Sequence, residues 1–491
     1  MRARIALRGP VTWGREPQDG WSGRLVRQVA VLMLVNVMVD TVIGAPLLVL
    51  PQMLDHFGTD QAAWLNASAM LAGAMWAPLL GKSADMHGAR RVLVLALAMC
   101  GAGALVCLLA PNIWVFIAGR LLQGAAVTAM FLTVALIRRI CAPRVAMTAV
   151  GVVTSGSALL GVVSPFFFQV LAARYGFRSV FVVSALLAVV AAWCVRALIP
   201  ESPVRTGGRL DVVGAVLLGG GLAAVLSYVS LGAEFGWVAA GPLALLCLGV
   251  AVLARWAVLA RRVPEPVVDI RSITRPLALT LLVVVLSTGA YQSMLQLLSL
   301  VAQVSPDDHL GYGLGARGGL GLLFALPSAG IMAGGTLAGW LAARVGPAWP
   351  LAGGVVIGTV ATAGMYPSMS SYPVALCFAG LLGFTAGAIV TSGFNMATSV
   401  APAAQQGVVT GLVQVMLAVG SVLMNMVGAA VLGSTTVLVA GAERNSAAGV
   451  RGCITLAAAS FVLATVAALF LARDRSLPPE SAPDSGRPPG A

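Results

Sequence analysis

The feature that most constrains this chain is a succession of apolar runs, each about twenty residues long, separated by short polar segments. A helix needs about 20 apolar residues to cross the ~30 Å hydrocarbon layer of a membrane. Of the 491 residues, 59% are hydrophobic and 10% are charged, far below the roughly 25% of charged residues in soluble domains. Because lipid offers no partner to open backbone groups, these runs are predicted to be helices. We therefore predict an all-α integral membrane protein with fourteen transmembrane helices, approximately at residues 29–50, 62–80, 92–110, 113–137, 147–171, 180–199, 212–231, 242–259, 277–301, 318–340, 349–366, 373–397, 408–432 and 453–472.

The basic residues indicate which side of the membrane each connection faces. Cytoplasmic connections keep an excess of Lys and Arg. If the N-terminus is cytoplasmic, 24 of the 30 basic residues fall on that side and five on the other, with Arg120 inside the membrane. The opposite orientation would put those 24 outside. We therefore predict a multi-pass protein of the inner (cytoplasmic) cell membrane with both termini in the cytoplasm.

Two long connections divide the runs into groups of six, two and six. A repeat supports two related halves, because Gly81 and Gly88 follow the second helix of the first group as Gly339 and Gly346 follow the second helix of the last. The tail is rich in proline and too polar to pack. The predicted organisation is a basic cytoplasmic N-tail (1–28), a six-helix bundle (29–199), a linker with an inserted two-helix hairpin (200–276), a second six-helix bundle (277–472) and a disordered cytoplasmic tail (473–491).

Composition and spacing also exclude several function classes. The net charge of +13 does not indicate a nucleic-acid partner, because the basic residues recur between apolar runs instead of clustering. The seven cysteines and three histidines lack metal-ligand spacing, and there is no P-loop or other catalytic motif. We expect a monomer, not an enzyme, without metal or cofactor, whose partners are the lipid bilayer, protons and a small molecule.

One connection carries a specific set of small and charged residues. Gly81, Asp85, Gly88, Arg90 and Arg91 follow the pattern G-x-x-x-D-x-x-G-x-[RK]-[RK]. The glycines permit a tight turn, and Asp85 can pair with Arg90 or Arg91 and face a helix N-terminus. The segment resembles the loop between the second and third helices of the major facilitator superfamily. The resemblance implies a latch that stabilises the outward-open state; the alternative is a turn with ordinary charges of a cytoplasmic loop.

Arg120 lies inside the fourth apolar run, where a charge normally faces a cavity or a partner. It opens the sequence R-L-L-Q-G, ending in Gln123 and Gly124, which resembles the R-x-x-Q-G element of the same superfamily. Asp40 is the only acid well inside any apolar run, at a similar depth in the first. We expect Asp40 and Arg120 to pair. We also expect the protonation of Asp40 to depend on whether the cavity is wet, open or occupied, as proton coupling requires. The alternative is a structural ion pair that ties two helices together.

Further segments resemble the fourteen-helix drug/proton antiporter branch of that superfamily, and the resemblance covers nearly all of residues 29–472. The fifth-helix motif of that branch, G-P-x-x-G-G, is replaced here by S-P-F-F-F-Q and keeps only Pro165. Earlier in the same helix, Gly156 and Gly161 still leave a helix face without side chains. In the first helix, Pro46 and two small residues stand where the branch has an asparagine. The matching segments are DTVI at 40–43, DVVG at 211–214, EPVVD at 265–269 and the region 379–428.

The resemblance implies proton-coupled efflux of drug-like or secondary-metabolite molecules by alternating access. The eroded fifth-helix motif leaves open a uniporter or importer of a small organic solute, and a non-transporting membrane sensor or assembly protein is the alternative from another class. The last six runs hold no ionisable residue well inside the membrane, so we expect an apolar or amphipathic substrate. The candidate cavity residues are polar or aromatic: Trp76, Phe131, Tyr291, Gln292, Gln296, Phe394, Asn395, Gln414 and Asn425.

Overall fold

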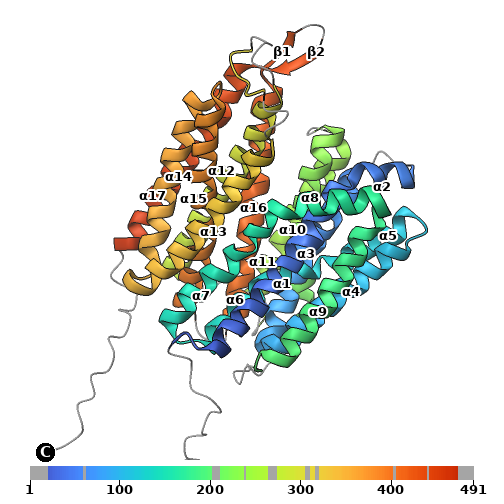
Figure 1. Ribbon diagram of the computed structural model, residues 1–491, viewed down its shortest axis with the longest axis vertical. Helices are drawn as coiled ribbons and strands as arrows, with labels where there is room; N and C mark the ends of the chain where they lie inside the picture. The colour runs from blue at the N-terminus through green and yellow to red at the C-terminus, as the bar shows by residue number, and fades with distance from the viewer. Residues whose placement is uncertain are drawn as a thin grey trace, which may run out of the picture.

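In a computed structural model of the chain, the described residues are almost entirely helical (Figure 1). Ten helical segments among the described residues are long and apolar enough to cross a membrane. This confirms a helical multi-pass membrane protein, whereas the number of fourteen spans and the position of the termini stay predictions. Much of the two predicted tails and the sequence match at 265–269 lie outside the described residues. The structure describes residues 20–58, 62–201, 211–236, 239–263, 274–304, 310–315, 320–401, 405–439 and 442–473.

The first bundle begins with a helix longer than its apolar run. α1 starts at Gly23, before the predicted start at residue 29, so the helix includes two arginines. The predicted fourth and fifth spans are each divided in two, at Gly124 and at Ser157. The helices of this bundle are α1 (Gly23–Leu48), α2 (Leu50–Phe57), α3 (Ala62–His87), α4 (Ala89–Leu109), α5 (Ile113–Gln123), α6 (Ala125–Ile140), α7 (Pro143–Gly156), α8 (Ala158–Tyr175) and α9 (Arg178–Leu198).

A helical pair and a second bundle follow. The pair α10–α11 packs through Ala215, Leu218 and Leu222 against α3 and α16. A short β-hairpin, which the sequence analysis did not predict, precedes the last helix, and the Tyr312 hydroxyl donates to the Asn445 carbonyl of its second strand over 2.7 Å. The elements are α10 (Val212–Phe235), α11 (Ala240–Ala260), α12 (Arg275–Gln303), α13 (Leu320–Val345), α14 (Ala348–Ser368), α15 (Tyr372–Val400), α16 (Gln406–Gly433), β1 (Thr436–Val439), β2 (Ala442–Asn445) and α17 (Ala447–Arg473).

The two bundles meet at one end and diverge toward the other (Figure 1). Phe394 and Val413 of the second bundle join the buried core of the first. We call the end at which α1 begins, where the bundles touch, the closed end, and the opposite end the open end. Glycine allows the closest helix contacts, as membrane helices require; a Cβ atom on Gly334 of α13 would lie 2.0 Å from the Phe384 carbonyl oxygen of α15.

Candidate functional site

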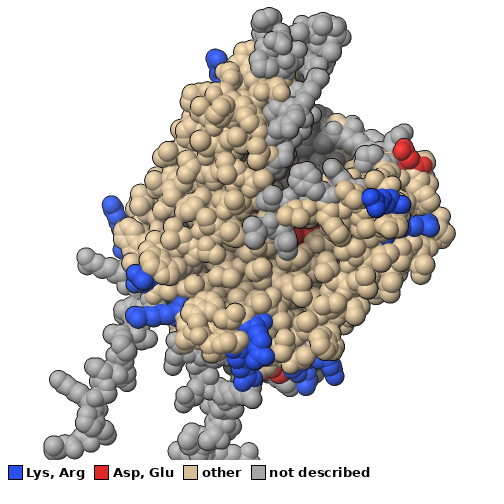
Figure 2. Space-filling model, viewed as in Figure 1, with Lys and Arg blue, Asp and Glu red and all other residues tan. Residues whose placement is uncertain are grey.

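A cavity of ≈ 940 Å³ lies between the two bundles. Figure 2 shows the molecule hollowed between them toward the open end. The first bundle contributes a carboxylate and hydroxyl groups, whereas α12 and α16 contribute side-chain amides and a phenol. Among the described lining residues Asp40 is the only acid, and none is Lys or Arg. The polar lining includes Asp40, Thr154, Ser155, Ser157, Ser164, Tyr291, Gln292, Gln296, Gln414 and Asn425.

Asp40 is exposed to this cavity from the middle of α1. Its carboxylate accepts a hydrogen bond from the Ser157 side chain. Ser157 lies at the junction of α7 and α8, so the interruption of the predicted fifth span falls beside Asp40. Among the described residues, the carboxylate therefore has one side-chain hydrogen bond, and its open side can be reached by a proton or a cargo molecule.

Arg120 does not pair with Asp40, contrary to the sequence-based expectation. Its side chain is fully buried on α5. One terminal nitrogen, Nη1, donates to the Val42 carbonyl oxygen and to Gln123 Oε1, both over 2.8 Å. The Nε and Nη2 atoms have no hydrogen-bond partner among the described residues. The guanidinium therefore binds the backbone of α1 two residues beyond Asp40.

Pro46 explains why the Val42 carbonyl is free to accept. In an α-helix this carbonyl would accept the N–H of residue 46, but proline has none. Pro46 lies inside α1, and Arg120 supplies the missing donor. The residues that stand in place of the family's asparagine therefore create the acceptor that the buried arginine uses.

Gly124 places the Arg120 element against α3. A Cβ atom on Gly124 would lie 2.6 Å from the Ala69 carbonyl oxygen, so no larger residue fits there without movement. Trp76, predicted to line the cavity, instead donates from its ring nitrogen to the Leu121 carbonyl over 3.0 Å. Gln123 and Gly124 thus join Arg120 in a packed contact between α3, α5 and α6.

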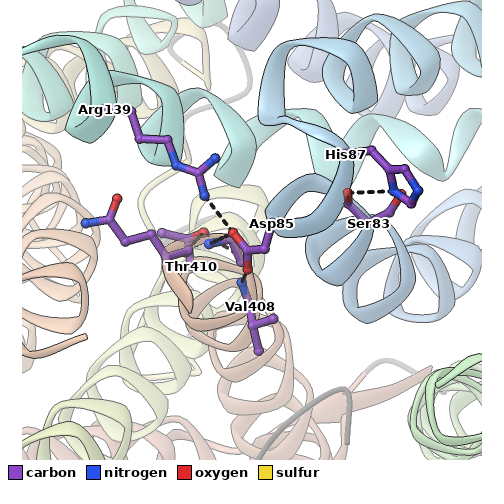
Figure 3. Close-up of polar contacts among 8 residues, drawn as sticks. Ser83, Asp85, His87, Arg139, Val408 and Thr410 are labelled. Carbon is purple, nitrogen blue, oxygen red and sulfur yellow. Dashed lines mark hydrogen bonds and ion pairs between the residues drawn. The ribbon is translucent and has the colours of Figure 1, made fainter. Parts of the chain in front are cut away.

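Asp85 joins the two bundles at the closed end (Figure 3). It pairs with Arg139 of α6 over 2.7 Å and accepts the N–H groups of Gly407 and Val408 over 3.1 Å each. Those N–H groups lie in the first turn of α16, which confirms that Asp85 faces a helix N-terminus. The predicted pairing with Arg90 or Arg91 is wrong.

The charge of Asp85 depends on opposing effects. Asp85 lies beyond the apolar run of α3, and burial raises its pKa to about 6, although Arg139 and the two N–H groups favour the charged form. Arg139 and the two N–H groups therefore stabilise the charged carboxylate against the effect of its burial. Gly407 permits the contact, because a Cβ atom there would lie 2.8 Å from the Asp85 carboxylate.

Arg90 and Arg91 pair with Glu201, beyond the end of α9, over 3.4 and 3.5 Å. Gly88 has a φ of 103° and allows this approach, because a Cβ atom there would lie 2.5 Å from the Glu201 carboxylate. These two arginines therefore fix α4 to α9 within the first bundle and do not join the two bundles.

Further contacts hold the bundles together near Asp85. Arg138 donates to the backbone and side-chain oxygens of Asn395 over 3.0 and 2.8 Å, and the Asn395 side chain donates to the Met147 carbonyl over 3.2 Å. On α7, a Cβ atom on Gly151 would lie 2.3 Å from the Gly335 carbonyl oxygen of α13. Asn395 was predicted to line the cavity, but it belongs to this interface because it lies at the closed end of α15.

Comparison with known proteins decides the family. The family model of the Major Facilitator Superfamily matches residues 32–424 and 304–490. The chain belongs to the Major Facilitator Superfamily. Similar proteins include the multidrug resistance protein Stp of Mycobacterium tuberculosis, 25% identical over 77% of this chain and 69% of Stp. The multidrug resistance protein B homolog of the same species is 28% identical over 66% of this chain and 63% of its own length.

A Lactococcus lactis uridine/deoxyuridine transporter is 31% identical over 62% of this chain and 64% of its own length. Among solved structures, the human organic anion transporter MFSD10 has a TM-score of 0.66 at 17% identity, covering 91% of this chain and 100% of its own. The Escherichia coli fucose:proton symporter FucP has a TM-score of 0.63 at 13% identity, covering 92% and 99%. The chain is therefore a transporter of the major facilitator fold and not an enzyme.

The cavity of this major facilitator protein contains five of the nine predicted lining residues. Phe131 and Phe394 are fully buried in packing, and Trp76 and Asn395 have the contacts given above. Gly156 packs against Met33 of α1, and Gly161 and Pro165 lie on α8, with their surroundings outside the described residues. The residues found in the cavity are Tyr291, Gln292, Gln296, Gln414 and Asn425.

Sequence reasoning missed Arg138, Arg139, Glu201 and Ser157. Arg138 and Arg139 were counted only as basic residues of a connection, and nothing in the sequence pairs them or Glu201 with residues more than fifty positions away. Ser157 had no signal at all, since a serine in an apolar run is common. The only available indication for Arg138 and Arg139 was their position as charged residues at the end of a helix.

Proposed function

We propose that this major facilitator protein exports a drug-like or secondary-metabolite molecule across the inner membrane as a monomer, driven by the proton gradient and without a cofactor. The observation that supports this most is the position of Asp40. It is the only acid among the described lining residues of the cavity between the bundles, and its hydrogen-bond partner there is a serine. A lone carboxylate of this kind can bind either a proton or a cargo donor, so the two compete for it.

The closed end supports alternating access as the transport step. For the closed end to open, Asp85 must lose Arg139 and the two N–H groups of α16, and Arg138 must release Asn395. These bonds stabilise the conformation described here, in which the cavity opens at the other end. Each proton that crosses with a membrane potential of 100 mV supplies about 2.3 kcal/mol.

The relatives and the cavity lining support an amphipathic cargo. Two similar proteins are named multidrug resistance proteins. The amide and hydroxyl groups of α12 and α16 offer hydrogen bonds, while Ile331, Val415 and Leu417 offer apolar surface. A molecule with a polar group and an apolar body would satisfy both.

The test is Asp40→Asn in proteoliposomes with an imposed pH gradient and ethidium, an amphipathic cation, as the probe. We expect the wild type to move ethidium against its gradient and the variant to lose gradient-driven movement while inserting normally. Asp55→Asn is the matched control, because Asp55 is exposed on α2 and does not line the cavity. Full gradient-driven transport by Asp40→Asn would refute the coupling role.

A uniporter or importer on the same fold is the second candidate. It is favoured by the similarity to a uridine/deoxyuridine transporter and by the lost glycines of the fifth-helix motif. Counterflow of labelled uridine in vesicles without a pH gradient distinguishes the two. Rapid counterflow that Asp40→Asn leaves unchanged would favour the uniporter over proton-coupled export.

A further inference from the structure

A second cleft lies between α1 and α9 at the closed end, apart from the central cavity. Its volume is ≈ 400 Å³, and its lining is Arg24, Arg27, Gln28, Ala197 and Leu198. None of these residues lines the cavity in which cargo is proposed to bind. The cleft is therefore a separate site from the cavity proposed for transport.

Hydrogen bonds hold the two walls of the cleft together. The Gln28 side chain is buried, and its Nε2 atom donates to the Leu198 carbonyl over 3.1 Å. Arg90 donates to the next carbonyl, that of Ile199, also over 3.1 Å. Hydrogen bonds thus connect the C-terminal end of α9 to both α1 and α4, and they fix the shape of the cleft within the first bundle.

The charge of the cleft is not balanced by the described part of the chain. Arg24 and Arg27 are three residues apart, so they lie on one face of α1, and both are exposed. Glu201, the acid that follows α9, pairs with Arg90 and Arg91. No described ion pair includes Arg24 or Arg27, and two guanidinium groups therefore converge on the cleft without an acid.

The surroundings point to the membrane surface. Trp21, just before α1, is 50% exposed, and Trp193 of α9 is 69% exposed. Tryptophan favours the boundary between headgroups and hydrocarbon. Ala197 and Leu198 give the cleft an apolar wall beside its two charges. Arginine binds phosphate oxygens through two parallel N–H groups.

We propose that this cleft binds the phosphate group of an anionic membrane lipid. Arg24 and Arg27 contact the phosphate oxygens, and Leu198 lies against the glycerol and the first part of the acyl chains. Basic pockets between membrane helices are suited to such headgroups, since charge and apolar surface are both satisfied. The bound lipid would link α1, which carries Asp40, to α9.

Native mass spectrometry of the purified full chain tests this with phosphatidylglycerol, phosphatidylcholine and glycerol phosphate as probes. We expect the wild type to retain phosphatidylglycerol in preference to phosphatidylcholine, whose phosphate is neutralised by choline. The variant Arg24→Gln/Arg27→Gln should bind phosphatidylglycerol roughly tenfold or more weakly, the effect of losing charge-assisted hydrogen bonds.

The control Arg255→Gln/Arg473→Gln removes the same charge from exposed sites outside the cleft and should bind like the wild type. Equal binding by the cleft variant and the wild type would overturn the proposal. An equal loss of phosphatidylglycerol binding in the control would also overturn it, because binding would then depend on net charge. Displacement of phosphatidylglycerol by equimolar glycerol phosphate would indicate a soluble phosphate ligand and would also overturn it. Lipid binding requires no transport, so its failure is distinct from failure of the proposed function.

Discussion

Arg120 and Pro46 depend on each other although they lie on different helices. The arginine donates to the carbonyl that the proline leaves without its helical partner. Asp40 and Arg120 could be identified from the sequence because charges are rare inside apolar runs. Their hydrogen-bond partners could not, because a backbone carbonyl and a serine hydroxyl have no distinctive sequence signal.

A double-mutant cycle tests this dependence at the residue scale. Arg120→Gln should lower the free energy of unfolding by about 1–3 kcal/mol, because the Val42 carbonyl loses its donor. In the Pro46→Ala background the loss should be smaller, since the alanine N–H at position 46 can donate to Val42. Thermal or denaturant unfolding in detergent measures both.

The control for this cycle is Pro327→Ala, a proline inside α13 of the second bundle, whereas Arg120 lies on α5 of the first. Its effect should add to that of Arg120→Gln, as expected for independent sites. If the cost of Arg120→Gln is the same with and without Pro46, the proposed dependence is incorrect.

At the scale of elements, the apolar runs predicted the helices well because only a helix satisfies its own backbone in lipid. The interruptions at Gly124 and Ser157 were missed, since an apolar run looks the same whether or not a new helix begins within it. The β-hairpin was missed because its strands are only four residues long. The helix contacts that depend on glycine come only from the structure, because the sequence does not show which glycine faces which helix.

The contact between α7 and α13 gives a prediction at this scale. Gly151→Ala places a methyl group 2.3 Å from the Gly335 carbonyl oxygen, so the two helices must separate at the closed end. We expect spin-label distances across this end to shift toward larger values. Gly220→Ala on α10 is the control, because nothing lies within 4 Å of a Cβ atom there; equal distance distributions for the two variants would show that the contact does not hold this end closed.

At the scale of the whole molecule, two bundles enclose a cavity that is sealed at one end by residues from both. The loop signature predicted that Asp85 seals against a helix N-terminus, and α16 provides it. Its arginine came from α6 instead of the same loop, because the fold brings distant helix ends together. Which end is closed could not be derived from the sequence, since one sequence must support both conformations of a transporter.

The predicted orientation is also a property of the whole molecule. Single-cysteine labelling tests it. In a chain without its natural cysteines, one cysteine replaces either Ser22 near the start of α1 or Val437 in the hairpin. Both positions are exposed. The excess of basic residues predicts that Ser22→Cys reacts with an impermeant thiol reagent only from the cytoplasm and Val437→Cys only from outside. The reverse pattern would show that the orientation is wrong.

Proton exchange by Asp40 is the central claim, and infrared difference spectroscopy of the reconstituted protein tests it most directly. The wild type should show a protonated carboxyl band that changes with pH, and the part of that band due to Asp40 should be missing in Asp40→Asn but present in Asp55→Asn, while the part due to Asp85 remains in both. A pH-dependent carboxyl band that is the same in the wild type and in Asp40→Asn would contradict the claim.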